Sequence, residues 1–227
     1  MAADTNESAS QYKIIVIPVD DDGCRFYLEQ YRPFRLASLQ QDPQAFGSTY
    51  EREIAFDEET WLGRIKNPLA KTFVAVRTHS NQIVASTSLI GPLPNATVSS
   101  NPYQVITAAP GEGDTKDTNS NSDSDDSANK APVYFQMSAV YTLPTARGCG
   151  LAKALIKAAT GEACDRAHSQ RRPLALSVVV YPDNAAAISV YERCGFARNP
   201  EEEPELVVNE VKKTSEWTVN MYYSGEP

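Results

Sequence analysis

Hydrophobic residues in the first half of the chain follow two different spacings, which predict different elements. The β-rich run from Tyr12 to Val19 predicts a first strand. Between Arg25 and Gln41 the apolar residues recur at helical spacing, so we predict a helix that Pro33 kinks or splits. Two further hydrophobic runs, Thr72 to Arg77 and Gln82 to Ile90, are separated by a polar turn and predict an antiparallel hairpin.

The remaining patterned segments extend this alternation of strands and helices. We predict a loop and then a helix within Gln44 to Lys66, and a closing hairpin of Leu206 to Val211 with Trp217 to Tyr223. Between them the pattern predicts a β-α-β-α passage made of Val133 to Thr142, Gly150 to Ala167, Leu174 to Tyr181 and Asn184 to Cys194. This order predicts a mixed α/β fold, with one mixed sheet and helices on both of its faces.

One long internal segment lacks any such pattern. Residues 111 to 130 contain no apolar residue before Ala128 and carry six acidic side chains. Such a segment cannot bury enough surface to offset its ordering entropy. We therefore predict a disordered acidic insertion at about 110–131 within a single domain at 11–227, preceded by a disordered N-terminus at 1–10.

Composition and charge narrow the classes of function. The net charge of −8 leaves no basic stripe for nucleic acid, and it favours a cationic, amine-bearing partner. The sequence contains no apolar run long enough to span a membrane and no secretion signal, so we expect a cytoplasmic or nuclear protein. Its four cysteines form no C-x-x-C pair and have no neighbouring histidines, so we expect free thiols and no metal site.

A glycine-rich turn joins the Val133 to Thr142 strand to the helix that follows it. Arg147-Gly148-Cys149-Gly150-Leu151-Ala152 fits the pattern R-x-x-G-x-A. Glycines allow close approach of an anion, and a helix N-terminus offers unpaired N–H groups and a positive dipole end. The turn lacks the G-x-x-x-x-G-K-[ST] loop of nucleotide triphosphatases, and Lys153 stands where a dinucleotide fingerprint needs a third glycine. An ordinary strand-to-helix turn remains the alternative at this point.

A second motif follows the turn by the length of one helix and one strand. Residues 184 to 196 fit N-x-x-A-x-x-x-Y-x-x-x-G-F, in which Asn184, Tyr191 and Gly195 have the ordinary roles of helix cap, packing residue and helix stop. Together with the glycine turn, this arrangement strongly resembles the GNAT superfamily of acetyl-coenzyme A-dependent N-acetyltransferases. The resemblance is specific in Val140 to Leu155 and Leu174 to Phe196.

The resemblance implies a fold and a cofactor site. It implies a twisted, largely antiparallel mixed sheet in which the strand at Val133 to Thr142 splays away from the strand at Leu174 to Tyr181. Acetyl-CoA would enter this gap as the acetyl donor. The resemblance assigns backbone groups to the pantetheine arm and to the pyrophosphate, and it places the Asn184 side chain near the pantetheine. The pantetheine would contact Val140, Tyr141 and Thr142, and the pyrophosphate would contact Arg147, Gly148, Cys149, Gly150, Leu151 and Ala152.

The chemistry that the resemblance implies is attack of a neutral amine on a thioester carbonyl. Tyr191 is the candidate general acid for the departing thiolate, with a packing role as the alternative. Some relatives carry a glutamate where this chain has Gln136, and glutamine accepts no proton at neutral pH. We therefore expect deprotonation through ordered water, which Gln136 would help to position. Cys149 has no histidine partner in a motif, so direct transfer in a ternary complex is favoured over an acyl-enzyme.

The acceptor is defined less sharply than the donor. Four aromatic side chains are candidates for the acceptor site: Tyr31, Phe46, Tyr50 and Tyr134. The acceptor would be a primary amine of a small molecule or of a protein. The alternative function is a catalytically inactive module that binds or senses acyl-CoA, and the sequence leaves the choice between a monomer and a homodimer open.

Overall fold

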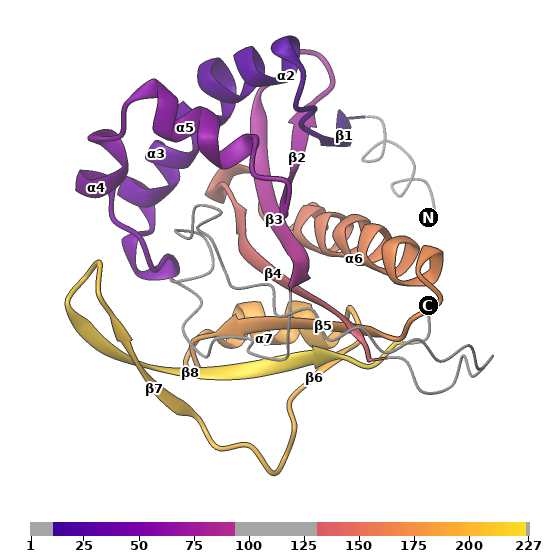
Figure 1. The fold of residues 1–227 in the computed structure, drawn as a ribbon. Helices are drawn as coiled ribbons and strands as arrows, with labels where there is room; N and C mark the ends of the chain where they lie inside the picture. Colours follow the sequence, from indigo (N-terminus) through magenta and orange to yellow (C-terminus); the bar gives the residue numbers. More distant parts are fainter. Residues whose placement is uncertain (1–10, 94–130, 226–227) are drawn as a thin grey trace, which may run out of the picture.

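A computed structural model describes residues 11–93 and 131–225 of the chain. The predicted disordered N-terminus at 1–10 and nearly all of the predicted acidic insertion lie outside these residues, so both stay predictions. The described part forms one curled sheet with helices around it (Figure 1).

The sheet contains eight strands in the order β1-β2-β3-β4-β5-β8-β6, with β7 paired to β8. Each neighbouring pair is antiparallel except β4 and β5, which are parallel and are connected through α6. The strands are β1 (Tyr12–Val16), β2 (Ala70–Arg77), β3 (Ile83–Leu93), β4 (Val133–Thr142), β5 (Leu174–Val180), β6 (Phe196–Ala197), β7 (Glu205–Asn209) and β8 (Thr214–Tyr223).

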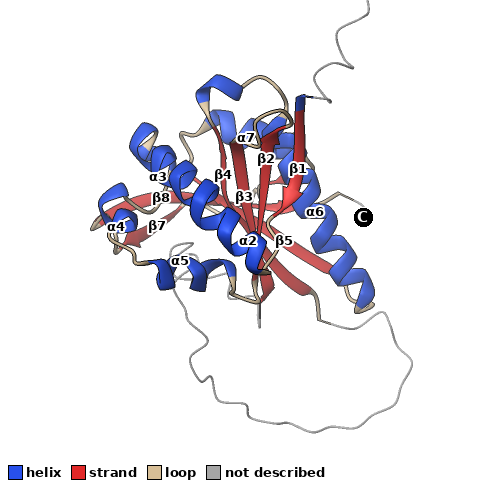
Figure 2. Cartoon of the chain, turned by 90° about the horizontal axis from the view of Figure 1, so that it is seen from above, coloured by secondary structure: helices blue, strands red, loops and turns tan. Residues whose placement is uncertain are grey.

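Helices cover both faces of the sheet, as the sequence predicts. Figure 2 shows α6 on one side of strands β1 to β4, and α2, α3 and α5 on the other side. The helices are α2 (Asp21–Phe26), α3 (Arg32–Gln41), α4 (Tyr50–Ile54), α5 (Glu58–Ile65), α6 (Leu151–Ser169) and α7 (Ala185–Glu192). The predicted mixed fold and both predicted hairpins are confirmed.

The first predicted helix differs from expectation at both its start and its middle. It begins at Asp21, because the Asp20 carboxylate accepts a hydrogen bond from the Gly23 N–H at 2.8 Å and caps it. At Pro33 the helix does not split, since helical residues continue through the proline. A π-helical turn, Tyr27–Tyr31, precedes the proline, and the Arg32 N–H donates to the Tyr27 carbonyl. This wider turn accommodates the missing N–H of the proline within a continuous helix.

Two other elements were not predicted. The segment expected to hold one helix contains both α4 and α5, which Thr49 and Asp57 cap separately. The two-residue strand β6 pairs Phe196 with Tyr223, a contact between distant segments that leaves no local pattern.

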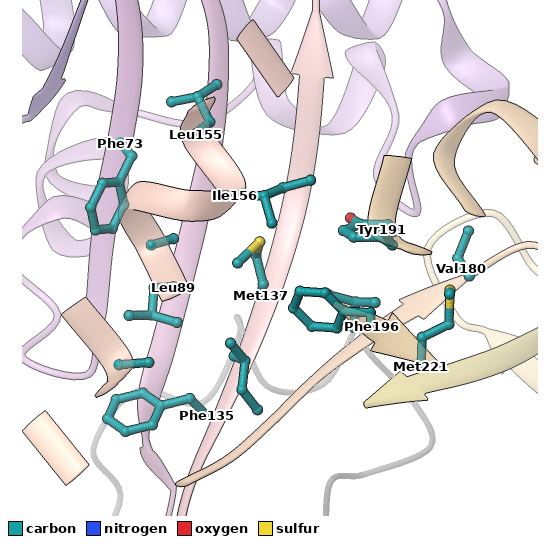
Figure 3. Packing of buried hydrophobic residues seen from close by; sticks show 14 of the residues in the cluster. Phe73, Leu89, Phe135, Met137, Leu155, Ile156, Val180, Tyr191, Phe196 and Met221 are labelled. Atoms are coloured by element: carbon teal, nitrogen blue, oxygen red, sulfur yellow. The ribbon is translucent and has the colours of Figure 1, made fainter. Parts of the chain in front are cut away.

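Alternating side chains along the strands build two separate hydrophobic cores. Phe73 and Ala75 of β2 pack in the core under α6, whereas Val74 and Val76 pack under α2, α3 and α5. Figure 3 shows the first core, in which Ile156 of α6 lies near Met137 of β4. Successive side chains of a strand point to opposite faces of the sheet, so the buried strand β2 contributes side chains to both cores.

A buried ion cluster joins the helices of the second face. Arg35 of α3 binds Glu53 of α4 with two hydrogen bonds, of 3.0 and 2.8 Å, and Arg64 of α5 donates a third at 2.9 Å. Burial by itself raises the pKa of the Glu53 carboxyl, but the two guanidinium groups outweigh it and lower the pKa to about 2. The cluster therefore links α3, α4 and α5 to one another, in addition to the packing of α3 and α5 on the second core.

We predict that Glu53→Gln lowers the free energy of unfolding by about 3–5 kcal/mol at neutral pH, because it leaves two buried cations without their carboxylate. Because the pKa of Glu53 is lower in the folded state, its contribution is fully present above the unfolded value of about 4.5. It is lost as the pH falls toward 2, so the variant should lose that part of the acid sensitivity. Urea denaturation over this pH range measures both effects.

Glu51→Gln is the matched control, since Glu51 is an exposed residue of the same helix. A Glu53→Gln variant as stable as Glu51→Gln, with an unchanged pH profile, would contradict the role of the cluster.

Candidate functional site

The sheet opens at its single parallel pair. Strands β4 and β5 pair from Val133 with Leu174 as far as Met137 with Val178, and their pairing stops there although both strands continue. From that point β5 pairs only with β8. The predicted splayed strand pair is therefore present, and beyond Met137 the edge of β4 that faces β5 has no partner strand among the described residues.

A bulge in β4 accompanies this opening. The register with β3 steps from Ser88 with Ser138 to Ser86 with Tyr141, so β4 carries one extra residue there. Ala139, within the bulge, has a positive φ of 54°, which is unusual for alanine. A bulge bends its strand and increases the local twist, which turns this part of β4 away from β5.

Two cavities meet at the opening. The larger, of about 1500 Å³, lies beside the glycine turn and α7, and the smaller, of about 660 Å³, lies under α4 and α5. Six residues line both of them: Ala45, Val140, Tyr181, Asn184, Ala187 and Tyr191. The two cavities are thus adjacent compartments that share a boundary at the split between β4 and β5.

The glycine turn forms one end of the larger cavity. Gly148 and Gly150 have φ values of 81° and 72°, in the left-handed region that glycine adopts readily. Gly150 precedes α6 without any side-chain cap, and the first helical hydrogen bond is donated by the Ala154 N–H to the Gly150 carbonyl. The preceding N–H groups are thus free of helical partners, and the first turn contains no acidic residue. This end of a 19-residue helix suits an anion.

Asp42 secures the start of the same turn. Arg147 donates through Nη2 to the Asp42 carboxylate at 2.7 Å and through Nε to the Thr142 carbonyl at 3.1 Å, and the Tyr141 hydroxyl donates to Asp42 at 2.6 Å. The hydrogen bond from Tyr141 and then the guanidinium of Arg147 lower the pKa of Asp42, although burial opposes them. The side chains of Tyr141 and Arg147 therefore anchor the cleft wall to the end of α3.

The α7 side supplies the wall opposite the glycine turn. The Asn184 side-chain oxygen accepts a hydrogen bond from the Ala187 N–H at 3.0 Å, which caps α7. Its amide nitrogen has no hydrogen bond to the described residues. Asn184 thus serves as a cap and lines both cavities, so its two expected roles are compatible in space.

Tyr191 lies at the boundary of the two cavities. Its ring packs edge-on against Phe196, with the ring centroids 5.6 Å apart, as Figure 3 shows. Burial, and secondarily Cys194, raises the pKa of the Tyr191 phenol. The hydroxyl therefore stays protonated at neutral pH and keeps a proton that it can donate.

The smaller cavity contains buried polar groups without partners. Gln136 is 1% exposed, and neither its amide nitrogen nor its amide oxygen forms a hydrogen bond. The hydroxyls of Ser48 and Ser138, which line the same cavity, also lack partners. Because a buried polar group without a partner is costly, these groups favour a ligand or water in the cavity.

Comparison with known proteins agrees with this geometry. Residues 119–196 match the model of the acetyltransferase (GNAT) family. The matched segment, which includes β4, α6, β5 and α7, is similar to that family. No curated protein matches the sequence.

Solved GNAT-fold structures extend the similarity over nearly the whole chain. Arabidopsis thaliana NAA60 in complex with acetyl-CoA has a TM-score of 0.56 at 14% identity, covering 93% of this chain and 98% of that one. A ribosomal-protein-alanine N-acetyltransferase from Brucella melitensis has a TM-score of 0.54 at 18% identity, with coverages of 92% and 98%. At such identities the likeness concerns the fold alone.

Most of the predicted cofactor-site residues gather at the larger cavity. Of the ten, only Cys149 does not line it; the other nine are Val140, Tyr141, Thr142, Arg147, Gly148, Gly150, Leu151, Ala152 and Asn184. Two lining residues are absent from the predicted site: Asp42, which lines the larger cavity, and Tyr181, which lines both.

The predicted acceptor-site residues are mostly dispersed. Phe46 lines the smaller cavity together with Gln136. Tyr31 instead stacks on Tyr27 in the core, with ring centroids 4.6 Å apart, and Tyr50 and Tyr134 line neither cavity. Apolar spacing does not distinguish an aromatic residue of the core from one of a pocket.

The described residues, 11–93 and 131–225, lack two kinds of feature. They contain no group of three or more His, Cys, Asp or Glu side chains placed to hold a metal ion. Within the same residues, no helix has the length and apolarity needed to cross a membrane.

Proposed function

We propose that this chain is an N-acetyltransferase of the GNAT type that transfers an acetyl group from acetyl-CoA to a primary amine of a small molecule or a protein. Acetyl-CoA would occupy the larger cavity, the amine would occupy the smaller one, and transfer would be direct within a ternary complex. The observation that carries this proposal is the meeting of the two cavities at the split between β4 and β5.

The larger cavity fits acetyl-CoA in its chemistry. The N–H groups at the start of α6 suit a pyrophosphate, and Lys153 and Arg193 also line the cavity. The open edge of β4, around Val140 and Thr142, offers backbone groups to the amides of a pantetheine arm in the manner of an added strand. Acetyl-CoA would supply an activated acyl carbon at the boundary of the two cavities.

Tyr191 would act as the general acid. The amine nitrogen forms a bond to the thioester carbon, the carbon–sulfur bond breaks, and the departing thiolate takes the proton of the Tyr191 phenol. An N–H on the open edge of β4 would stabilise the transient oxyanion. Tyr191 then regains a proton from solvent.

The amine proton would leave through water. Glu53 is the carboxylate that lines the smaller cavity, but its pKa of about 2 and its three hydrogen bonds from arginines make it a poor base. Gln136, with its free amide oxygen, would orient the water that accepts the proton. Bulk solvent is the final acceptor.

The pyrophosphate site can be tested at Gly150. We predict that Gly150→Asp weakens acetyl-CoA binding at least tenfold, because it places a negative charge where the pyrophosphate would lie. Gly150→Asn is the matched control, since asparagine has the same shape, tolerates a positive φ and adds no charge. Isothermal titration calorimetry measures both affinities. Equal affinities of the two variants would contradict an anion at this turn.

The general acid can be tested by comparing two tyrosines that both line the two cavities. We predict that Tyr191→Phe lowers kcat at least tenfold and leaves acetyl-CoA affinity unchanged, because it removes only the proton donor. Tyr181→Phe should retain most activity, since the Tyr181 hydroxyl donates to Glu216 at 2.6 Å. Release of coenzyme A, followed with a panel of polyamines, amino acids and peptides, gives the rates.

The same panel separates an enzyme from a binding module. Tight acetyl-CoA binding without turnover on any amine would contradict the proposed transferase and favour an acyl-CoA-binding role. A larger loss in Tyr181→Phe than in Tyr191→Phe would instead move the acid to Tyr181.

Direct transfer can be tested at Cys149. We predict that Cys149→Ala retains turnover within about twofold, because this exposed thiol lines neither cavity. Steady-state kinetics and acetyl-CoA binding are measured on the same preparation. Loss of turnover with intact coenzyme binding would indicate an acyl-enzyme and overturn direct transfer.

A further inference from the structure

The smaller cavity is cationic although the chain as a whole is acidic. The chain has a net charge of −8, yet this cavity is lined by four cationic side chains and by Glu53 as the one carboxylate among its lining residues. The four cations are Arg35, Arg52, Arg64 and Lys66. The local charge around a ligand, rather than the net charge, determines which ligand is attracted at short range.

Glu53 cannot neutralise this charge. Arg35 and Arg64 share its one carboxylate, so their cluster keeps an excess positive charge. Arg64 binds Glu53 through Nη1 only, and a guanidinium has five N–H donors. The remaining donors of Arg64 have no hydrogen-bond partner among the described residues.

Two further cations lie on the same wall without counterions. Half-buried Arg52 of α4 stacks over the Phe56 ring at 5.4 Å, and Lys66 follows α5. Neither forms an ion pair with the part of the chain that the structure describes. Helices α4 and α5 therefore present uncompensated cations to the cavity.

The opposite wall offers neutral hydrogen-bonding groups. Gln136 of β4 is buried there with its whole amide unpartnered, and Ser138 lies beside it along the strand with an unpartnered hydroxyl. An amide and a hydroxyl both donate hydrogen bonds to carboxylate oxygens. A ligand with an anionic group would satisfy these donors and the cations together.

We propose that the acceptor amine also carries a carboxylate close to its amino group, and that Arg52, Arg64 and Lys66 bind this carboxylate. The inference rests on the proposed function, since it assigns the smaller cavity to the acceptor. The carboxylate is held at the α4 and α5 wall, and the amine points to the boundary at Tyr191. A polyamine has only positive charges and is repelled by the same wall. Free amino carboxylates and peptides with an acidic residue after the first position both offer this chemistry.

The test measures binding separately from turnover. The full chain, saturated with coenzyme A, is titrated calorimetrically with amino carboxylates of increasing chain length, the carboxamide of each, spermidine, and paired peptides with Glu or Gln as the second residue. We expect at least one carboxylate to bind at least tenfold more tightly than its carboxamide and than spermidine. A preference among the amino carboxylates would identify the ligand as a free amino carboxylate. A preference among the paired peptides would identify it as a peptide.

Two variants locate the preference. Arg52→Gln and Lys66→Gln should each weaken carboxylate binding, and together by at least tenfold, with carboxamide binding unchanged. These positions are chosen because neither contacts Glu53, so the helices keep their anchor. Lys157→Gln is the matched control, because Lys157 is exposed on α6 and lines neither cavity.

The outcomes separate this inference from the proposed function. Equal binding of carboxylates and carboxamides, tighter binding of spermidine, or no carboxylate binding at all would overturn the inference. Acetyl-CoA is then supplied and coenzyme A release is followed with the same compounds. Carboxylate-selective binding without release would contradict the transferase, and with it an acceptor role for the ligand, but would support the carboxylate site at the α4 and α5 wall. Equal turnover of acids and amides would support the transferase and overturn the inference.

Discussion

The separation of β4 from β5 is the constraint on which the rest of this structure depends. These strands form the one parallel pair of the sheet, and they lie in its interior rather than at an edge. When their pairing stops after Met137, the sheet opens from one face to the other. The bulge at Ala139 turns β4 aside, and the pairing of β5 with β8 keeps β5 from following.

Elements on both sides of the opening are fixed by polar contacts. On one side Asp42 holds Tyr141 and Arg147, which ties the glycine turn to the end of α3. On the other side Glu53 holds Arg35 and Arg64 and places α4 and α5 over the smaller cavity. The β7–β8 hairpin also reaches the loop after α3, where the Asn209 side chain donates to the Gly47 carbonyl at 3.0 Å (Figure 1). Distant parts of the chain therefore form the walls of the cavities, and specific hydrogen bonds hold these parts in position.

The molecule retains unsatisfied groups where a ligand would bind. Gln136 and Ser138 are buried without partners on the strand that borders the opening, whereas Asp42 and Glu53 are fully engaged nearby. Partly satisfied polar groups reduce stability, and protein sites tolerate them where a substrate completes the network. Asp42 and Glu53 therefore shape the site, whereas Gln136 and Ser138 are available to a ligand.

Local patterns predicted most elements, and they failed where distant segments decide the outcome. The hydrophobic run of β2 and the glycines before α6 act within a few residues, so both could be recognised in the sequence. The helical spacing around Tyr31 was also real, but it could not indicate that the ring stacks on Tyr27 in the core. Strand β6 forms because Phe196 pairs with Tyr223, 27 residues away, and Asp42 acts through Arg147, 105 residues away. Neither contact leaves a local signal in the sequence.

The sequence by itself determined the fold class, the glycine turn at Gly148 and Gly150, and the helix that carries Tyr191, because dihedral preferences and hydrophobic spacing are local properties. Only the tertiary structure decided that β4 and β5 part after Met137 and that Tyr191 lies where two cavities meet. It also decided that four cations of the α3 to α5 region surround a cavity in an acidic chain. The charge and the shape of a site depend on all the residues that folding brings together there. The order of these residues along the chain does not show which of them will be neighbours.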